Sequence, residues 1–327
     1  MKKALLIQTA FIGDAILATA TLSTLKTLGF TVDVLVRRGN ENFFKDHPDC
    51  NKVIVWDKKG SIGKYRSLLR IITEVRNSKY QSVINLQRFA ATGILTALSG
   101  AKFKLGFTQN PLSFAFTHTL KHSVKVNYHE SYRNLDLLHL AFPGAVHASP
   151  NLFLTAEVLE SVERYKTKKY ICIFPGSVWF TKRLSNDKWL ELLQILPKEY
   201  TVYFLGAPNE KAMCNDLINL GSKHHSNLKN LCGEMSLMQS AALGKDAEMN
   251  YCNDSSPVHF LSAVDANITA FFLSTAPIFG FYPVSKNANV LQAENLPCKP
   301  CGMVGKASCP LGHFDCNKLI DIKSVVL

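Results

Sequence analysis

The chain has 327 residues, of which 47% are hydrophobic and 19% are charged. This length exceeds what one hydrophobic core normally organises, and the composition excludes a disordered chain, so we expect two globular domains. Lys and Arg outnumber Asp and Glu by 37 to 25, which gives a net charge of +12. The surplus favours an anionic partner, which can be nucleic acid, nucleotide phosphates or an anionic membrane surface.

The N-terminus has some features of a signal peptide. Lys2 and Lys3 precede an apolar run, and residues 18–20 read Ala-Thr-Ala, as at a cleavage site. Asp14, however, lies inside what would be the apolar segment, where a charge is unfavourable. No other apolar stretch reaches the roughly 18 residues that a membrane-spanning helix needs. We therefore expect a soluble, cytoplasmic protein.

Short apolar runs in the first half of the chain predict buried strands, and segments with helical spacing lie between them. The strands are expected at residues 4–8, 31–36, 53–56 and 82–86, and the helices at residues 15–28 and 65–77. This alternation indicates a parallel sheet with helices on both faces.

The same alternation begins again after Pro150. Here the strands are expected at residues 170–174, 201–205, 247–252 and 268–273, and the helices at residues 157–169, 187–196 and 257–264. We predict an α/β protein with two Rossmann-like, doubly wound domains, residues 1–150 and 151–327, that face an interdomain cleft. Ligands of such sheets bind at the carboxyl ends of the strands.

The first candidate site lies between the first strand and the first helix, at Phe11–Asp14. We expect Gly13 to allow a tight turn and Asp14 to lie near the helix N-terminus, which favours its ionised form. An ionised carboxylate at the cleft could act as general base on an acceptor hydroxyl. The alternative is a simple helix N-cap.

The second candidate follows the strand at residues 170–174. Gly176 and Ser177 are followed by the adjacent cations Lys182 and Arg183. Exposed backbone N–H groups, a hydroxyl and two positive charges favour a phosphate site, although the spacing is not that of a Walker loop. The alternative is solvated surface.

The third candidate repeats this design after the strand at residues 247–252. Ser255 and Ser256 follow Asp254, and Pro257 suits the first turn of the next helix, with His259 about one turn further along. The serines could bind phosphate beside the helix N-terminus. The alternative is a well-capped helix with an incidental histidine.

Four cysteines gather near the C-terminus, at Cys298, Cys301, Cys309 and Cys316. A zinc ribbon has two CxxC pairs, and here only the first pair has that spacing. Zinc or an iron–sulfur cluster, a thiol or disulfide-stapled loop, and no role all stay open. The odd total of nine cysteines argues against an obligate disulfide framework and fits a reducing cytosol.

Taken in order, these motifs resemble glycosyltransferase family 9, the ADP-heptose:lipopolysaccharide heptosyltransferases, and most closely the heptosyltransferase II type. The resemblance spans residues 5 to 316. It rests on Phe11–Asp14, Pro175–Ser177, Thr181–Arg183, Gly206-Ala207 with Glu210, residues 233–237, Asn253–Ser255 with His259, and the cysteine-containing stretch. Each motif is weak alone, but the ordered set is specific.

The resemblance implies a GT-B fold, with an N-terminal acceptor-binding domain and a C-terminal donor-binding domain. It implies inverting transfer of heptose from ADP-heptose to the inner core of lipopolysaccharide. Asp14 matches the catalytic base, and Lys182 matches the lysine that stabilises the leaving diphosphate. Glu210 and Met235 match ribose and adenine contacts. The full set expected at the donor site is Gly13, Gly176, Ser177, Arg183, Gly206, Glu210, Met235, Asp254, Ser255, Ser256 and His259.

The resemblance also implies the partners: ADP-heptose or a related nucleotide sugar, a lipid A–core acceptor, and peripheral contact with the inner face of the inner membrane. Cations and N–H groups can stabilise the leaving group without an obligatory metal, and a divalent cation is unproven. Nucleic acid is not expected, because the basic residues are dispersed and no recognition motif occurs.

Three departures from the family pattern leave alternatives open. Ser256 stands where the family usually has Gly, Leu184 stands where it has Trp, and residues 279–283 replace a Phe-Gly-Pro-Thr segment. Because Gly allows close approach of the backbone to phosphate, Ser256 can change how the donor lies. The alternatives are transfer of another nucleotide sugar and a non-catalytic nucleotide-sugar binding protein of the same fold.

Overall fold

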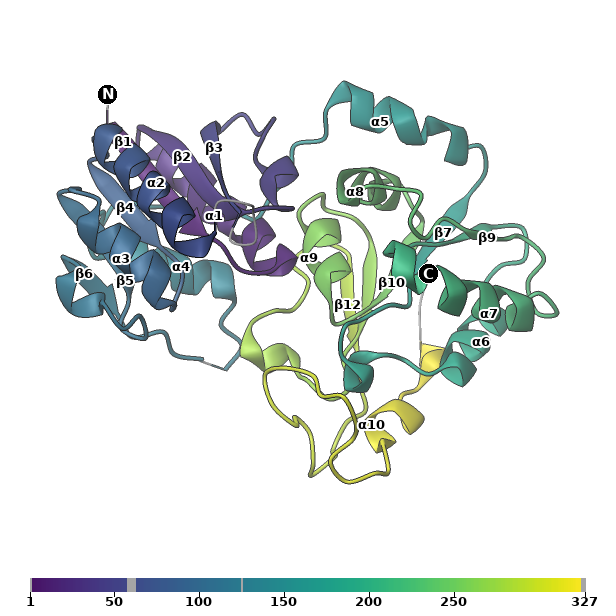
Figure 1. Cartoon of the computed structure of the whole chain (residues 1–327). Helices are drawn as coiled ribbons and strands as arrows, with labels where there is room; N and C mark the ends of the chain where they lie inside the picture. The colour runs from purple at the N-terminus through teal and green to yellow at the C-terminus, as the bar shows by residue number, and fades with distance from the viewer. Residues whose placement is uncertain (1, 58–62, 125, 325–327) are drawn as a thin grey trace. The chain divides into compact units, whose positions relative to one another are not determined.

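The computed structural model describes residues 2–57, 63–124 and 126–324 (Figure 1). The chain forms two compact units, Met1–Phe153 and Leu154–Leu327, and thus divides close to the boundary expected near residue 150. Among the described residues, each helix is too short or too polar to cross a membrane.

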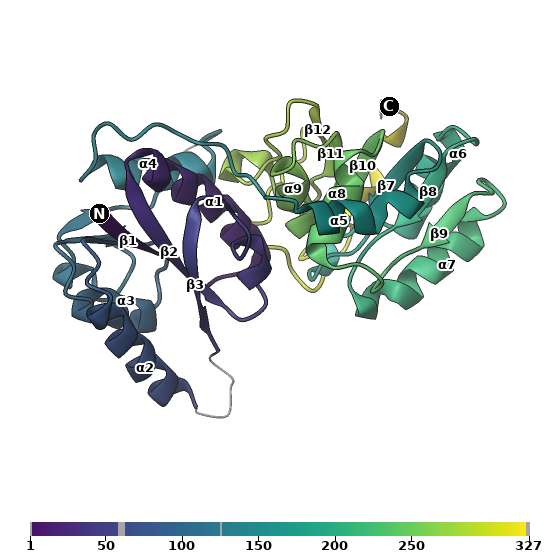
Figure 2. The same ribbon diagram turned by 90° about the horizontal axis from the view of Figure 1, so that it is seen from above.

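Unit 1 contains a six-stranded parallel sheet with the order β3-β2-β1-β4-β5-β6. Its strands are β1 (Lys2–Gln8), β2 (Phe30–Arg37), β3 (Cys50–Trp56), β4 (Ser82–Asn85), β5 (Phe103–Phe107) and β6 (His118–Leu120). Its helices are α1 (Ile12–Thr27), α2 (Lys64–Asn77), α3 (Ala90–Leu98) and α4 (Glu130–His139). Helices α1 and α4 pack together on one face of the sheet, and α2 and α3 on the other (Figure 2).

Unit 2 repeats this topology with the order β12-β11-β10-β7-β8-β9. Its strands are β7 (Tyr170–Phe174), β8 (Thr201–Phe204), β9 (Leu228–Asn230), β10 (Met249–Asn253), β11 (Ile268–Phe271) and β12 (Ala288–Leu291). Its helices are α5 (Ala156–Val162), α6 (Asn186–Ile195), α7 (Lys211–Gly221), α8 (Leu237–Lys245), α9 (Ser256–Ser262) and α10 (Asp315–Lys318). Helix α8 packs against α5 and α9, and α6 packs against α7.

The predicted strands are all present, and their ends lie within three residues of the expected positions. The central strands β7 and β10 are buried along their whole length, as expected for a parallel sheet that is covered on both faces. Such strands read as continuous apolar runs, which is why the sequence predicts them well.

Helix α1 begins at Ile12, three residues earlier than predicted. Gly13 therefore lies inside the helix and has no left-handed backbone, so the expectation that it forms a tight turn is wrong. Gly29 does have a left-handed backbone, with φ of 81°, and it ends the helix as expected.

The helix predicted at residues 157–169 is also too long. Helix α5 ends at Val162, the only buried residue of the helix, and a short 3-10 turn follows. No residue from 163 to 169 is buried, so packing does not favour a longer helix. Lys166 then pairs with Glu163 and with Asp246, each at 2.7 Å.

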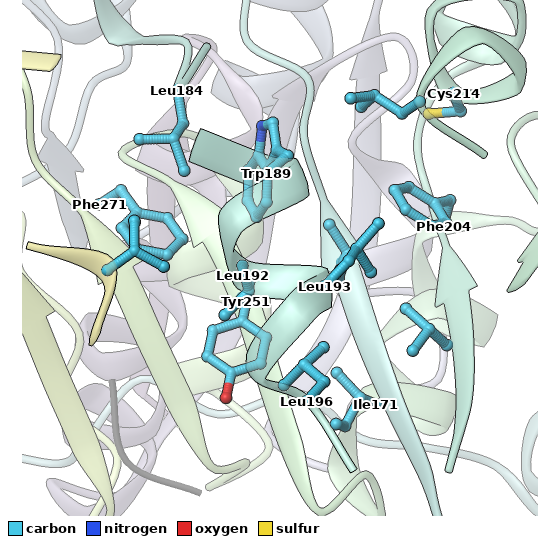
Figure 3. Packing of buried hydrophobic residues seen from close by; sticks show 14 of the residues in the cluster. Ile171, Leu184, Trp189, Leu192, Leu193, Leu196, Phe204, Cys214, Tyr251 and Phe271 are labelled. Carbon is cyan, nitrogen blue, oxygen red and sulfur yellow. The ribbon is translucent and has the colours of Figure 1, made fainter. Parts of the chain in front are cut away.

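The core of unit 2 lies between α6 and the sheet (Figure 3). The ring of Trp189 contacts Phe271 edge to face, with the ring centroids 5.3 Å apart. Leu192 and Leu193 fill the space beside it, and Cys316 joins the same cluster from the C-terminal segment. The C-terminal segment, as far as Ile322, is therefore part of this core.

Leu192 and Ile195 provide a matched test of this packing, because they lie on the same helix but differ in burial. Leu192 is fully buried, whereas Ile195 is 44% exposed. We expect Leu192→Ala to lower the free energy of unfolding of unit 2 by about 2–5 kcal/mol, and Ile195→Ala by less than about 1 kcal/mol. Urea unfolding followed by circular dichroism measures both changes, and equal costs would contradict the packing described.

Candidate functional site

The strand order of each sheet reverses once, and doubly wound sheets bind ligands at that point. In unit 1 the reversal lies between β1 and β4, and in unit 2 between β7 and β10. The loops that follow these four strands contain the three candidate sites that the sequence indicates around Asp14, Lys182 and Asp254. The topology thus gathers the predicted residues at two sheet edges.

Asp14 lies in the first turn of α1, at the carboxyl end of β1. The N-cap is Phe11, so Asp14 is not the helix cap and that alternative is wrong. Beside it, the side chains of Gln8 and Gln87 are hydrogen-bonded to each other and join the ends of β1 and β4. Polar side chains therefore connect the two strands at the reversal.

The environment of Asp14 raises the pKa of its carboxyl group to about 6. Burial is the main cause, and the negative charge of Glu130 adds to it. Hydrogen bonds from the backbone N–H groups of Phe11 and Asp14, and the charge of Arg88, oppose the rise. A carboxylate that is ionised at neutral pH yet has a pKa close to it has the properties of an effective general base.

Glu130 is a residue that the sequence does not single out. It begins α4, and its carboxylate accepts a hydrogen bond from Arg133 Nη1 at 2.6 Å and lies 3.1 Å from His122 Nε2. Arg133 pairs with this carboxylate, and the charge of Glu130 acts on Asp14. No element is predicted between residues 87 and 141, so its place beside α1 could not be foreseen.

In unit 2, Lys182 and Asp254 form an ion pair between the two strand-end loops. Lys182 Nζ lies 2.7 Å from Asp254 Oδ2, and the side chains are only 15% and 8% exposed. The hydroxyl of Thr275 donates a second hydrogen bond to the same oxygen. Charges this poorly hydrated require such partners, because desolvation is costly.

Asn253, the last residue of β10, ties the two loops together. Its side-chain amide donates to the carbonyl of Pro175 at 2.7 Å, and its side-chain oxygen accepts from the N–H of Leu184 at 3.0 Å. Ser255 Oγ donates to the carbonyl of Gly176 at 3.4 Å. The sequence includes Asn253 in a motif but does not indicate this bridging role.

Arg183 and Glu210 also belong to this loop cluster. Arg183 Nε donates to the carbonyl of Ser177 at 2.6 Å. The carboxylate of Glu210 accepts from the N–H of Ala207 at 2.7 Å and lies directly against Gly176 and Gly206. A Cβ atom at either glycine would approach that carboxylate closer than 3.0 Å and displace the end of the Glu210 side chain, whereas neither glycine has a left-handed backbone.

His259 and Met235 complete the predicted donor-site residues. His259 is buried in α9, and burial, together with the charge of Lys182, lowers its pKa to about 4. Its ring is therefore neutral at physiological pH. Met235 lies in the turn before α8, half-buried, and the backbone of that turn bonds to Gly206 through the N–H of Gly233 at 2.9 Å. Ser256 begins α9.

The four C-terminal cysteines have free thiols. Across residues 2–57, 63–124 and 126–324, no three His, Cys, Asp or Glu side chains are arranged to hold a metal ion. The zinc hypothesis for Cys298, Cys301, Cys309 and Cys316 stays a prediction. Burial raises the pKa of the Cys316 thiol, and the charges of the other three cysteines add to the rise. Cys316 also packs into the core of unit 2.

Comparison with known proteins identifies the family. The sequence profile described as "Glycosyltransferase family 9 (heptosyltransferase)" matches residues 68–310, well over half of the chain. The chain belongs to glycosyltransferase family 9. As a member of this family, the protein is a glycosyltransferase, and the family expected from the ordered motifs is confirmed.

Two curated relatives and one solved structure agree with this assignment. The chain is 26% identical to lipopolysaccharide heptosyltransferase 1 of Campylobacter coli, over 88% of this chain and 86% of the relative. It is 24% identical to lipopolysaccharide heptosyltransferase 3 of Escherichia coli K12, over 88% and 87%. The structure of E. coli ADP-heptose lipopolysaccharide heptosyltransferase II matches with a TM-score of 0.77 and 17% identity, over 89% and 90% of the two chains. The GT-B fold expected from the sequence is thus confirmed.

The Lys182–Asp254 pair predicts an asymmetry between single and double variants. Lys182→Met leaves the buried Asp254 carboxylate without its cation, and we expect a loss of about 3–5 kcal/mol in unfolding free energy. Adding Asp254→Asn removes the unpaired charge and should restore most of that stability.

The exposed pair Lys286–Asp265, 2.8 Å apart, is the control for this measurement. Breaking it with Lys286→Met should cost less than about 1 kcal/mol. Urea unfolding of the wild type and the three variants tests the prediction. A double variant that is less stable than Lys182→Met would show that the pair is not the source of the loss.

Proposed function

We propose that this glycosyltransferase moves heptose from ADP-heptose to the inner core of lipopolysaccharide, with inversion at the anomeric carbon. The observation that supports this most is the carboxylate of Asp14, which lies at the strand-order reversal of unit 1 with a pKa of about 6. The curated relatives are named lipopolysaccharide heptosyltransferases, and the similar E. coli structure is named for ADP-heptose.

In the proposed reaction Asp14 takes the proton from an acceptor hydroxyl as the oxygen attacks the anomeric carbon of the donor sugar. The bond between that carbon and the diphosphate oxygen breaks, and ADP leaves with the electron pair. The negative charge on the diphosphate is stabilised by Lys182, whose ammonium group exchanges Asp254 for phosphate oxygens. This chemistry needs no obligatory metal ion.

The donor is proposed to bind along the strand-end loops of unit 2. Ser177, Arg183, Ser255, Ser256 and His259 then contact the diphosphate and sugar, and Glu210 and Met235 the ribose and adenine. Gly176 and Gly206 support this arrangement, because their lack of a side chain leaves space for the Glu210 carboxylate beside the loop. Gly13 is proposed to let the donor approach the first turn of α1 closely.

We propose that the acceptor is the lipid A–core and that the enzyme works in the cytoplasm, at the inner face of the inner membrane. The net charge of +12 supports this location, because anionic headgroups attract basic surfaces. The acceptor phosphates add to that attraction.

Asp14→Asn tests the proposed role of the base. The amide keeps the size of the side chain but cannot accept the proton, so we expect turnover of ADP-heptose to fall by about 10²–10⁴-fold while donor affinity stays within about threefold. Product formation is followed by mass spectrometry, and donor affinity by calorimetry.

A thermal-shift screen of ADP, UDP, GDP and their sugars is the companion experiment, because a ligand that binds only the folded protein raises its melting temperature. If another nucleotide sugar stabilises the protein and ADP-heptose does not, the donor is that nucleotide sugar and the proposed donor is wrong. Normal turnover by Asp14→Asn would remove the assigned role of Asp14.

The pH dependence of turnover provides a second test of the base. Since Asp14 is active when ionised, kcat/KM should fall below about pH 6. Glu130→Gln removes a negative charge that raises the pKa of Asp14, so its acid limb should move to lower pH. Asp46→Asn, which changes an exposed carboxylate of the same unit, should leave the limb in place. An unmoved limb in Glu130→Gln contradicts the coupling.

A further inference from the structure

The cysteine-containing segment at residues 298–316, here called the cysteine loop, has no role in the reaction described above. It nevertheless contacts the Lys182 turn, the short 3-10 element Phe180–Lys182, at several points. The ring of Phe314 lies 5.3 Å from that of Phe180, centroid to centroid. These contacts raise the question of what the cysteine loop does for Lys182.

Two hydrogen bonds, one to the backbone and one to the side chain of Thr181, join it to the cysteine loop. The N–H of Thr181 donates to the carbonyl of Lys306 at 3.1 Å, and the N–H of Lys306 donates to Thr181 Oγ1 at 2.8 Å. The same hydroxyl oxygen accepts from Ser274 Oγ at 2.9 Å. Cys301 closes the arrangement, because its N–H donates to the carbonyl of Ser274 at 2.8 Å.

Gly305 brings the cysteine loop against the side chain of Lys182 itself. A Cβ atom at Gly305 would lie 2.4 Å from Trp179 Cβ, 2.7 Å from Lys182 Cγ and 2.8 Å from Lys182 Cδ. The backbone of Gly305 therefore packs against the aliphatic stem, while Asp254 holds the ammonium group at the other end. The stem and the charged end are both held in place.

We propose that the cysteine loop is a brace that positions the Lys182 ammonium group for the leaving diphosphate, and that Thr181 and Gly305 are positioning residues of the transfer reaction. Their role follows from the proposed function of Lys182 and adds the part of the chain that holds it. The buried hydroxyl of Thr181 is bonded to the cysteine loop, and the backbone of Gly305 packs against the lysine stem because Gly305 has no side chain. These contacts hold the stem in one position. Restricting a charged group in this way before the reaction is how preorganised sites lower the barrier.

Matched variants distinguish a loss of Lys182 positioning from a general loss of stability. Thr181→Val keeps the shape but loses the hydroxyl, and Thr181→Ser keeps the hydroxyl. Gly305→Ala places a methyl group against Trp179 Cβ and the Lys182 stem, and so pushes the cysteine loop away from the Lys182 turn. Ser308→Ala changes an exposed side chain of the same loop and serves as the control.

The first readout does not require turnover. An N-hydroxysuccinimide ester acylates exposed lysines, and peptide mass spectrometry measures the rate at Lys182. Because the ammonium group is held and mostly buried, we expect slow labelling in the wild type and about threefold or faster labelling in Thr181→Val and Gly305→Ala. Thr181→Ser and Ser308→Ala should label as the wild type does. Unchanged labelling in both Thr181→Val and Gly305→Ala overturns the brace.

The second readout is turnover of ADP-heptose per folded molecule. We expect Thr181→Val and Gly305→Ala to lower kcat about 10-fold or more, with a smaller change in KM, and Thr181→Ser to recover most of the rate. In the Lys182→Ala background, Thr181→Val should have little further effect, because it acts through Lys182. Fully additive losses overturn the positioning role. A wild type that shows protected Lys182 but no transfer contradicts the proposed function and leaves the brace intact.

Discussion

The buried ion pair between Lys182 and Asp254 is the interaction on which the arrangement of unit 2 depends. Two charges with little access to water require compensating contacts, and the surrounding chain supplies them. Thr275 donates to the carboxylate, Asn253 fixes the adjoining loops, and the cysteine loop packs along the lysine stem. The strand ends, α9 and the C-terminal segment therefore converge on one place in the fold.

The carboxylates at the two strand-order reversals have different electrostatic environments. Asp254 lies 2.7 Å from the ammonium group of Lys182. Asp14 is buried near another acid, Glu130, and its pKa is raised. Similar topology thus places a carboxylate that pairs with a cation in one unit and a carboxylate of raised pKa in the other.

Much of this fold could be predicted because its central strands are uninterrupted apolar runs, as in β1 and β7. The loops after those strands could be located too, but each also had a structural alternative, and only for Asp14 does the structure exclude it, because Phe11 is the N-cap. Helix boundaries were harder, because α5 ends where burial ends and α1 begins where Phe11, a poor cap by residue type, adopts the cap backbone. The contribution of Glu130 depends on the packing of α4 against α1, which no local pattern encodes.

Glu130 and Glu210 act on their two sites in different ways. Around Asp14 the neighbouring acid acts through its charge, whereas the carboxylate of Glu210 acts by filling the volume beside two glycines. Positions 176, 206 and 210 are therefore coupled through one carboxylate. A methyl group at either glycine would push the end of the Glu210 side chain away from the N–H of Ala207, whose hydrogen bond it accepts.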